Sequence, residues 1–100
     1  MGKSYTKNPL TAGRVVDGVA FIVTAANNRM HSLNSTATLL WKLAEDGITA
    51  DDAARALVEE FEVALDVATA DAAECLDDLV ERQILVEAGG EAAGETGDPT

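Results

Sequence analysis

The residue types most often used for nucleophilic or metal chemistry are scarce in this chain. It has one histidine, His31, and one cysteine, Cys75, and the two are far apart in the sequence. A nucleophilic site needs a base beside its serine or cysteine, and a protein metal site usually takes three or four ligands. Cys75 also lies in an apolar helical pattern, where free cysteine packs as a small hydrophobic residue. The sequence therefore predicts no catalytic nucleophile, no metal site and no internal disulfide.

Carboxylates are abundant, but their arrangement does not favour acid–base catalysis. General acid–base chemistry requires carboxylates brought together in an apolar cleft. The adjacent pairs here fall at expected helix ends or on polar faces: Glu45-Asp46, Asp51-Asp52, Glu59-Glu60 and Asp77-Asp78. We therefore expect solvated surfaces, no enzyme activity and no cofactor.

The formal net charge of −11 is distributed unevenly along the chain. Residues 1–44 contain five basic residues and one acidic residue, whereas residues 45–100 contain two basic and 17 acidic residues. Proteins that bind nucleic acids usually present clustered lysine and arginine to the phosphates. The acidic half therefore argues against a nucleic-acid partner, and most of its charge is expected to maintain solubility.

Length and hydropathy favour one small domain in the cytoplasm. No apolar run approaches the roughly 20 residues that span a bilayer, and the first dozen residues are polar, which predicts no membrane segment and no secretory signal. Residues 1–12 are expected to form a flexible arm, residues 13–87 the folded domain, and residues 88–100 a disordered acidic tail. Whether so small a core is supplemented by a homodimer is left open.

An antiparallel meander of three strands is predicted after the arm. Two β-prone runs, residues 14–16 and 19–24, flank Asp17-Gly18, and an Asp-Gly pair in this position is a strong hairpin signal. Asn27-Asn28 suits a second turn because asparagine tolerates left-handed backbone. A third strand should follow at residues 29–33.

The third strand is the place where side chains indicate recognition. Its alternation puts Arg29, His31 and Leu33 on one face and Met30 and Ser32 on the other. We place this strand at an edge of the sheet. An open edge can accept an extended peptide, whereas basic side chains can also serve to block it.

Three helices are predicted after residue 33. The first should be capped by Asn34 or Ser35 and end at Gly47, and the second should be capped by Thr49. The third should start at Asp66 or Thr69 and run to about Arg82. Apolar spacing of three and four places one face of each helix in the core: Leu33, Ala37, Leu40, Trp41 and Ala44; Ala54, Leu57, Val58 and Phe61; Ala72, Ala73, Cys75, Leu76, Leu79 and Val80. Residues 84–86 could then pack on the core or add a strand.

Several segments together resemble the PqqD family. A short strand ends in Leu33-Asn34, and Leu40-Trp41 follow on the first helix. Gly47-Ile48-Thr49 then precedes the second helix, and residues 78–85 are similar to the family's closing pattern, with Gln83 where glycine is usual. The resemblance spans roughly residues 14–87. The segment 63–70 departs from the family pattern, which leaves the register of the third helix open.

The resemblance implies a winged-helix-like α+β fold with a three-stranded antiparallel N-terminal sheet followed by three helices. It also implies a RiPP recognition element, a non-catalytic peptide chaperone. Such a protein binds the leader segment of a ribosomally made precursor peptide and presents it to a modifying enzyme, such as a radical SAM protein, in cofactor or peptide natural-product biosynthesis. The leader is expected to add to the third strand and to pack against the third helix. By position, the peptide-binding residues would be Arg29, Met30, His31, Ser32, Leu33, Asp71, Ala72, Cys75, Asp78 and Leu79.

Three other functions fit parts of the sequence. A winged-helix DNA regulator would share the fold, but the helix starts carry acidic residues such as Asp51 and Asp71 instead of DNA-reading side chains. An acidic carrier protein would need a modified serine, and Ser35 lacks the expected aspartate before it. A structural subunit without affinity for leader peptides also remains compatible with the sequence.

Overall fold

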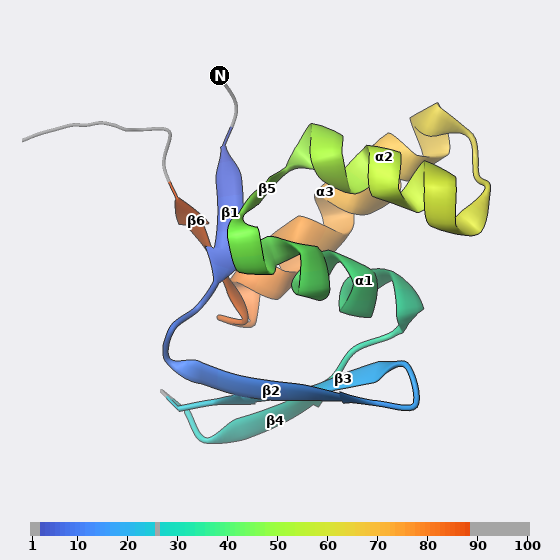
Figure 1. Cartoon of the computed structure of the whole chain (residues 1–100). Coiled ribbons are helices and arrows are strands. Elements are labelled where there is room, and N and C mark those ends of the chain that lie inside the picture. The colour runs from blue at the N-terminus through green and yellow to red at the C-terminus, as the bar shows by residue number, and fades with distance from the viewer. Residues whose placement is uncertain (1–2, 26, 89–100) are drawn as a thin grey trace, which may run out of the picture.

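The structure is a computed structural model and describes residues 3–25 and 27–88. Three helices lie on one side of a three-stranded sheet, and a second small sheet packs beside them (Figure 1). The predicted tail lies outside the described residues except for Ala88. The elements are β1 (Ser4–Lys7), β2 (Thr11–Val16), β3 (Val19–Thr24), β4 (Arg29–Ser32), α1 (Ser35–Leu43), the 3₁₀ helix η1 (Ala44–Asp46), β5 (Ile48–Thr49), α2 (Ala50–Phe61), α3 (Leu65–Glu81) and β6 (Leu85–Ala88).

The larger sheet is the predicted antiparallel meander. Its strand order is β2-β3-β4, so β4 lies at an edge in the described part of the chain, as expected. Asp17 and Gly18 have φ of 54° and 80°, the two positive values that a tight hairpin turn requires. Asn28, with φ of 56°, makes the second turn. The residues of the two turns therefore determine where the chain reverses in this sheet.

The first helix starts where the sequence predicts. The Asn34 side chain accepts a hydrogen bond from the Ala37 backbone N–H at 2.8 Å, which makes Asn34 the N-cap. Thr38 joins the helix to the sheet, because its hydroxyl accepts from the Ala20 N–H at 3.1 Å and donates to the Leu33 carbonyl at 3.2 Å. The predicted buried residues of this helix are all in the core.

The second helix begins in a reciprocal cap. Thr49 accepts from the Asp52 N–H at 3.1 Å, and the Asp52 carboxylate accepts from the Thr49 N–H at 3.2 Å. The prediction of a buried Phe61 is wrong, since this side chain is 39% exposed. Phe61 is the last residue of α2, and the left-handed backbone of Glu62 ends the helix at this point. The Phe61 ring therefore lies at the edge of the core.

The third helix starts earlier than predicted, at Leu65, and neither Asp66 nor Thr69 caps it. Ala64 is the N-cap residue and contributes only its backbone: its carbonyl accepts from the Ala68 N–H at 2.9 Å. Both predicted caps lie inside the first turns, where Thr69 donates to the Leu65 carbonyl at 2.8 Å. The left-handed Glu62 ends α2 so abruptly that α3 can start after two residues.

The prediction of a flexible arm over residues 1–12 does not hold for Thr11 and Ala12, which belong to β2, or for Ser4–Lys7. Ser4–Lys7 form β1, the central strand of the second sheet, with strand order β5-β1-β6. Tyr5 is buried at 7% exposure and belongs to the core. Both alternatives for residues 84–86 are realised, because Leu85–Ala88 pairs with β1 as a strand while Ile84 and Leu85 pack in the core.

Asn8 joins the two sheets to the end of α3. Its backbone N–H donates to the Ile84 carbonyl at 3.0 Å, and its side-chain Nδ2 donates to the Gln83 carbonyl at 2.8 Å. The Asn8 side-chain oxygen also accepts from the Leu10 N–H at 3.0 Å, which closes a turn before β2. Gln83 itself is left-handed, with φ of 66°, and ends α3. One residue therefore fixes the start of the meander against the end of α3.

None of the helices within the described residues is long and apolar enough to span a membrane.

Trp41 packs tightly beneath β2. Lys7 Nζ lies 3.7 Å from the centroid of the indole ring. The edge of the same ring approaches Gly13. A Cβ at Gly13 would lie 2.5 Å from Ile22 Cδ1 and 2.7 Å from Trp41 Cζ2, closer than atoms can pack. The glycine is therefore needed for space.

Replacing Gly13 with alanine should destabilise the fold by about 1–3 kcal/mol, because the added methyl overpacks the contact between Trp41 and Ile22. Urea unfolding followed by Trp41 fluorescence would measure the change. Arg14→Ala, at the exposed neighbouring position, is the control and should alter stability by less than about 0.5 kcal/mol. Equal stability of Gly13→Ala and the unmodified protein would contradict the packing described.

Candidate functional site

The edge strand β4 offers backbone hydrogen-bonding groups for a further strand. The Leu33 N–H donates to the Ala20 carbonyl of the meander at 2.9 Å, and the register pairs His31 with Ile22. Because neighbouring residues of an antiparallel strand point their backbone groups to opposite sides, Met30 and Ser32 direct theirs away from β3. The N–H and C=O groups of these two residues therefore face the open edge.

The side chains of β4 differ between its two faces. On one face, Met30 is 71% exposed and Ser32 is exposed as well. On the other face, Arg29 at the start of the strand is exposed. His31 lies opposite the buried Ile22 and is partly buried, and its Nε2 atom is buried without a hydrogen-bond partner in the described part of the protein.

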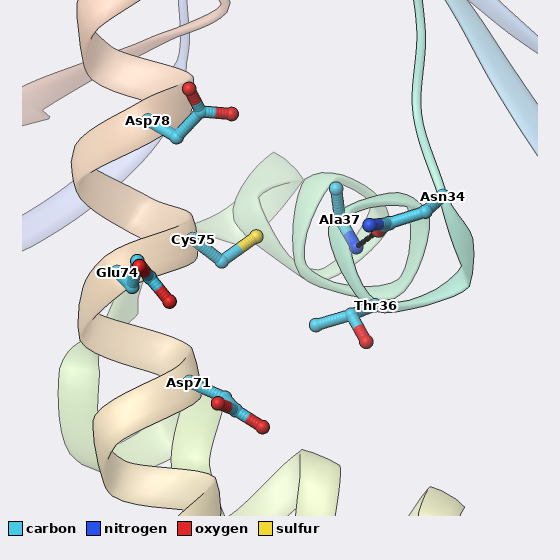
Figure 2. A pocket seen from close by; sticks show the side chains of 7 residues that line it. All are labelled: Asn34, Thr36, Ala37, Asp71, Glu74, Cys75 and Asp78. Carbon is cyan, nitrogen blue, oxygen red and sulfur yellow. Dashed lines mark hydrogen bonds between the residues drawn. The ribbon is translucent and has the colours of Figure 1, made fainter.

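A pocket of about 400 Å³ lies between α3 and the start of α1 (Figure 2). The α3 residues that line it are spaced as on one face of a helix. The α1 residues belong to its capped first turn. Figure 2 shows that the side chains of Asp71, Cys75 and Asp78 project from α3 toward the side on which α1 lies. The lining residues are Asn34, Thr36, Ala37, Asp71, Glu74, Cys75 and Asp78.

Asn34 connects the pocket to the edge strand. It is separated from β4 by Leu33 alone, and it is also the N-cap of α1. The pocket therefore opens near the end of β4. A segment that extended along the edge of β4 toward Asn34 would reach the acidic face of α3.

The structure brings together only some of the residues predicted for the site. Asp71, Cys75 and Asp78 line the pocket, and Arg29, Met30, His31 and Ser32 lie on the edge strand. The other three predicted residues belong to the core, with exposures of 3% for Leu33 and 0% for Ala72 and Leu79. These three residues pack beneath β4 and α3, which form the two walls of the site.

The sequence reasoning did not find four of the pocket residues: Asn34, Thr36, Ala37 and Glu74. Glu74 follows Asp71 by three residues and precedes Asp78 by four, so helical spacing alone places it on the same face. The contribution of α1 had no comparable signal, because it depends on how α1 and α3 pack.

The lining of the pocket is acidic. Asp71, Glu74 and Asp78 contribute three carboxylates, and Asp78 forms an ion pair with Arg82 at 3.1 Å. Burial, followed by the charge of Asp78, raises the pKa of the Cys75 thiol to about 11. Cys75 is therefore a protonated thiol at neutral pH and a poor nucleophile.

Within residues 3–25 and 27–88, no three histidine, cysteine or acidic side chains form a group that could hold a metal ion.

Comparisons with known proteins agree on the family and the fold. Residues 20–85 match the family described as Coenzyme PQQ synthesis protein D (PqqD). The fold is similar to that of TbiB1 in complex with the TbiA(beta) leader peptide, with a TM-score of 0.75 and 17% identity over 87% of this chain and 98% of that chain. It is also similar to lasso peptide synthetase B1 complexed with the leader peptide, with a TM-score of 0.72 and 24% identity over 82% and 96%. No curated protein matches the chain significantly.

The raised pKa of Cys75 predicts slow alkylation. A shift from 9.0 to about 11 leaves about a hundredfold less thiolate at pH 8, so iodoacetamide should react far more slowly with the folded protein than with the protein unfolded in urea. Mass spectrometry of timed samples measures both rates. Equal rates in the two states would contradict the burial and the negative field described for the pocket.

Proposed function

This chain belongs to the PqqD family, and on that premise we propose that it binds the leader segment of a ribosomally made precursor peptide. In this proposal it presents the leader to a modifying enzyme, such as a radical SAM protein, during the biosynthesis of a cofactor or peptide natural product. Its own role is recognition without catalysis.

The observation that carries this proposal is the open edge of β4 beside the α3 pocket. Met30 and Ser32 direct their backbone N–H and C=O groups outward, so a peptide strand can form main-chain hydrogen bonds with both residues. Backbone bonds of this kind are indifferent to side-chain identity. They supply affinity for any extended segment that can reach the edge.

Selectivity in this account comes from the side chains on α3 and α1. Successive residues of the bound strand would point to opposite faces, so alternate side chains would turn toward the helices. The pocket at Asn34 and Asp71 lies on that side and has room for one large side chain. The edge of β4 and the pocket beside α3 together form one groove. In this groove the edge binds the peptide backbone and the pocket selects a side chain.

Several features support a role without catalysis. The pocket holds carboxylates and a protonated thiol, and its lining includes no histidine that could serve as a base. PqqD-like proteins that bind leader peptides are generally non-catalytic partners. Both structural neighbours, TbiB1 and lasso peptide synthetase B1, were determined with a leader peptide.

The substitution Met30→Pro tests the edge directly. Proline removes the outward N–H and adds a ring where the peptide strand would lie, whereas an edge strand tolerates proline at an outward-facing position. We expect the variant to remain folded and to bind the leader peptide at least about tenfold more weakly. The probe is a fluorescently labelled synthetic candidate leader peptide, and fluorescence anisotropy measures its affinity.

Met30→Ala is the matched control, because it removes the same side chain and keeps the N–H. It should retain most of the affinity, and circular dichroism should give the same spectrum for both variants. Equal binding by Met30→Pro and Met30→Ala would argue against strand addition at β4. A wild-type protein that did not bind the peptide at all would favour a structural subunit instead.

A further inference from the structure

We propose, on the basis of the function proposed above, that this protein selects leader segments that place a lysine or arginine side chain in the pocket between α3 and α1. The pocket would then read one basic residue of the leader, while the edge of β4 holds its backbone. The physical basis is the combination of a cavity, an adjacent open strand and the charge of the cavity wall.

The acidic side chains lie on the face of α3 that borders the groove. Asp71, Glu74 and Asp78 follow one another at spacings of three and four residues, and all three line the pocket. Figure 2 shows these carboxylates along the length of α3 beside the start of α1. A long basic side chain that entered the pocket would meet carboxylate oxygens from more than one turn of the helix.

The charge of this wall is only partly neutralised within the protein. Asp78 pairs with Arg82, but Asp71 and Glu74 form no ion pair within the described residues. Arg29 is at the far end of β4 from Asn34, so it lies away from the pocket entrance. A peptide cation therefore offers these two carboxylates a partner that the described chain does not supply.

The rest of the lining suits the hydrocarbon part of such a side chain. Ala37 is buried and Cys75 is half-buried, and together they give the cavity an apolar surface beside the carboxylates. Lysine and arginine bury their methylene stems along apolar surface while their charged heads reach polar groups. A volume of about 400 Å³ accommodates a side chain of this length.

Selection from a random peptide library tests this inference and does not depend on the sequence of any particular leader. The full-length protein is used to select phage-displayed random dodecapeptides at low salt. We expect the enriched peptides to share a lysine or arginine at one fixed position. The same selection with the double variant Asp71→Asn/Glu74→Gln should lose that preference, since both residues are exposed and their amides keep the size of the side chains.

The matched control is Asp77→Asn/Glu81→Gln, which removes the same charge from exposed positions of α3 outside the pocket lining. The best enriched peptide, synthesised and measured by calorimetry, should bind about five- to tenfold more weakly to the pocket variant and within about twofold of wild type to the control. Enriched peptides without a preferred basic position, or equal losses in the two double variants, would overturn the inference and leave peptide binding intact. Undiminished binding of the best peptide to Met30→Pro would overturn strand addition at β4 and this inference with it. A protein that enriched no peptide and bound no leader peptide would overturn the proposed function as well.

Discussion

The geometry of the groove depends on the hydrogen bonds that Asn8 makes to the end of α3. The two walls of the groove, β4 and α3, come from parts of the chain that are more than 30 residues apart. Asn8 bonds to the carbonyls of Gln83 and Ile84 just before the meander begins, while β1 pairs with β6 along its whole length. Without this connection, the sheet would be held to α3 mainly through α1. These contacts outside the groove therefore set the spacing between edge and helix together with the packing of α1 against β3 and α3.

In the proposed function, this arrangement separates the parts of the protein that give stability from those that would bind the peptide. Core residues such as Leu33 and Leu79 support the two walls from beneath and are unavailable to a ligand. The outward backbone groups of Met30 and Ser32 and the carboxylates of α3 remain on the surface. In the proposed function, changes to the exposed pocket carboxylates Asp71 and Glu74 could alter the choice of peptide with little effect on folding.

Much of the fold could be predicted because its signals are local. The Asp17-Gly18 turn and the Asn34 and Thr49 caps each depend on a few neighbouring residues, and all are confirmed. Strand β1 could not be predicted, since its four residues are largely polar and its partners lie more than 40 positions away. Glu74 was accessible from helical spacing, whereas the part of α1 in the pocket depends on tertiary packing. Family resemblance predicted β4 and α3 as the two sides of the peptide site but did not give the orientation of Ala72 or Leu79, which are buried.

The central claim, that a leader peptide adds as a strand to β4, is tested most directly by amide hydrogen exchange. Labelled protein is compared by NMR with and without a synthetic leader peptide that it binds. The account predicts that the Met30 and Ser32 amides exchange rapidly in the free protein and become protected when the peptide binds. The His31 amide, which points toward β3, should be protected in both states. Binding that left Met30 and Ser32 unprotected would contradict the account.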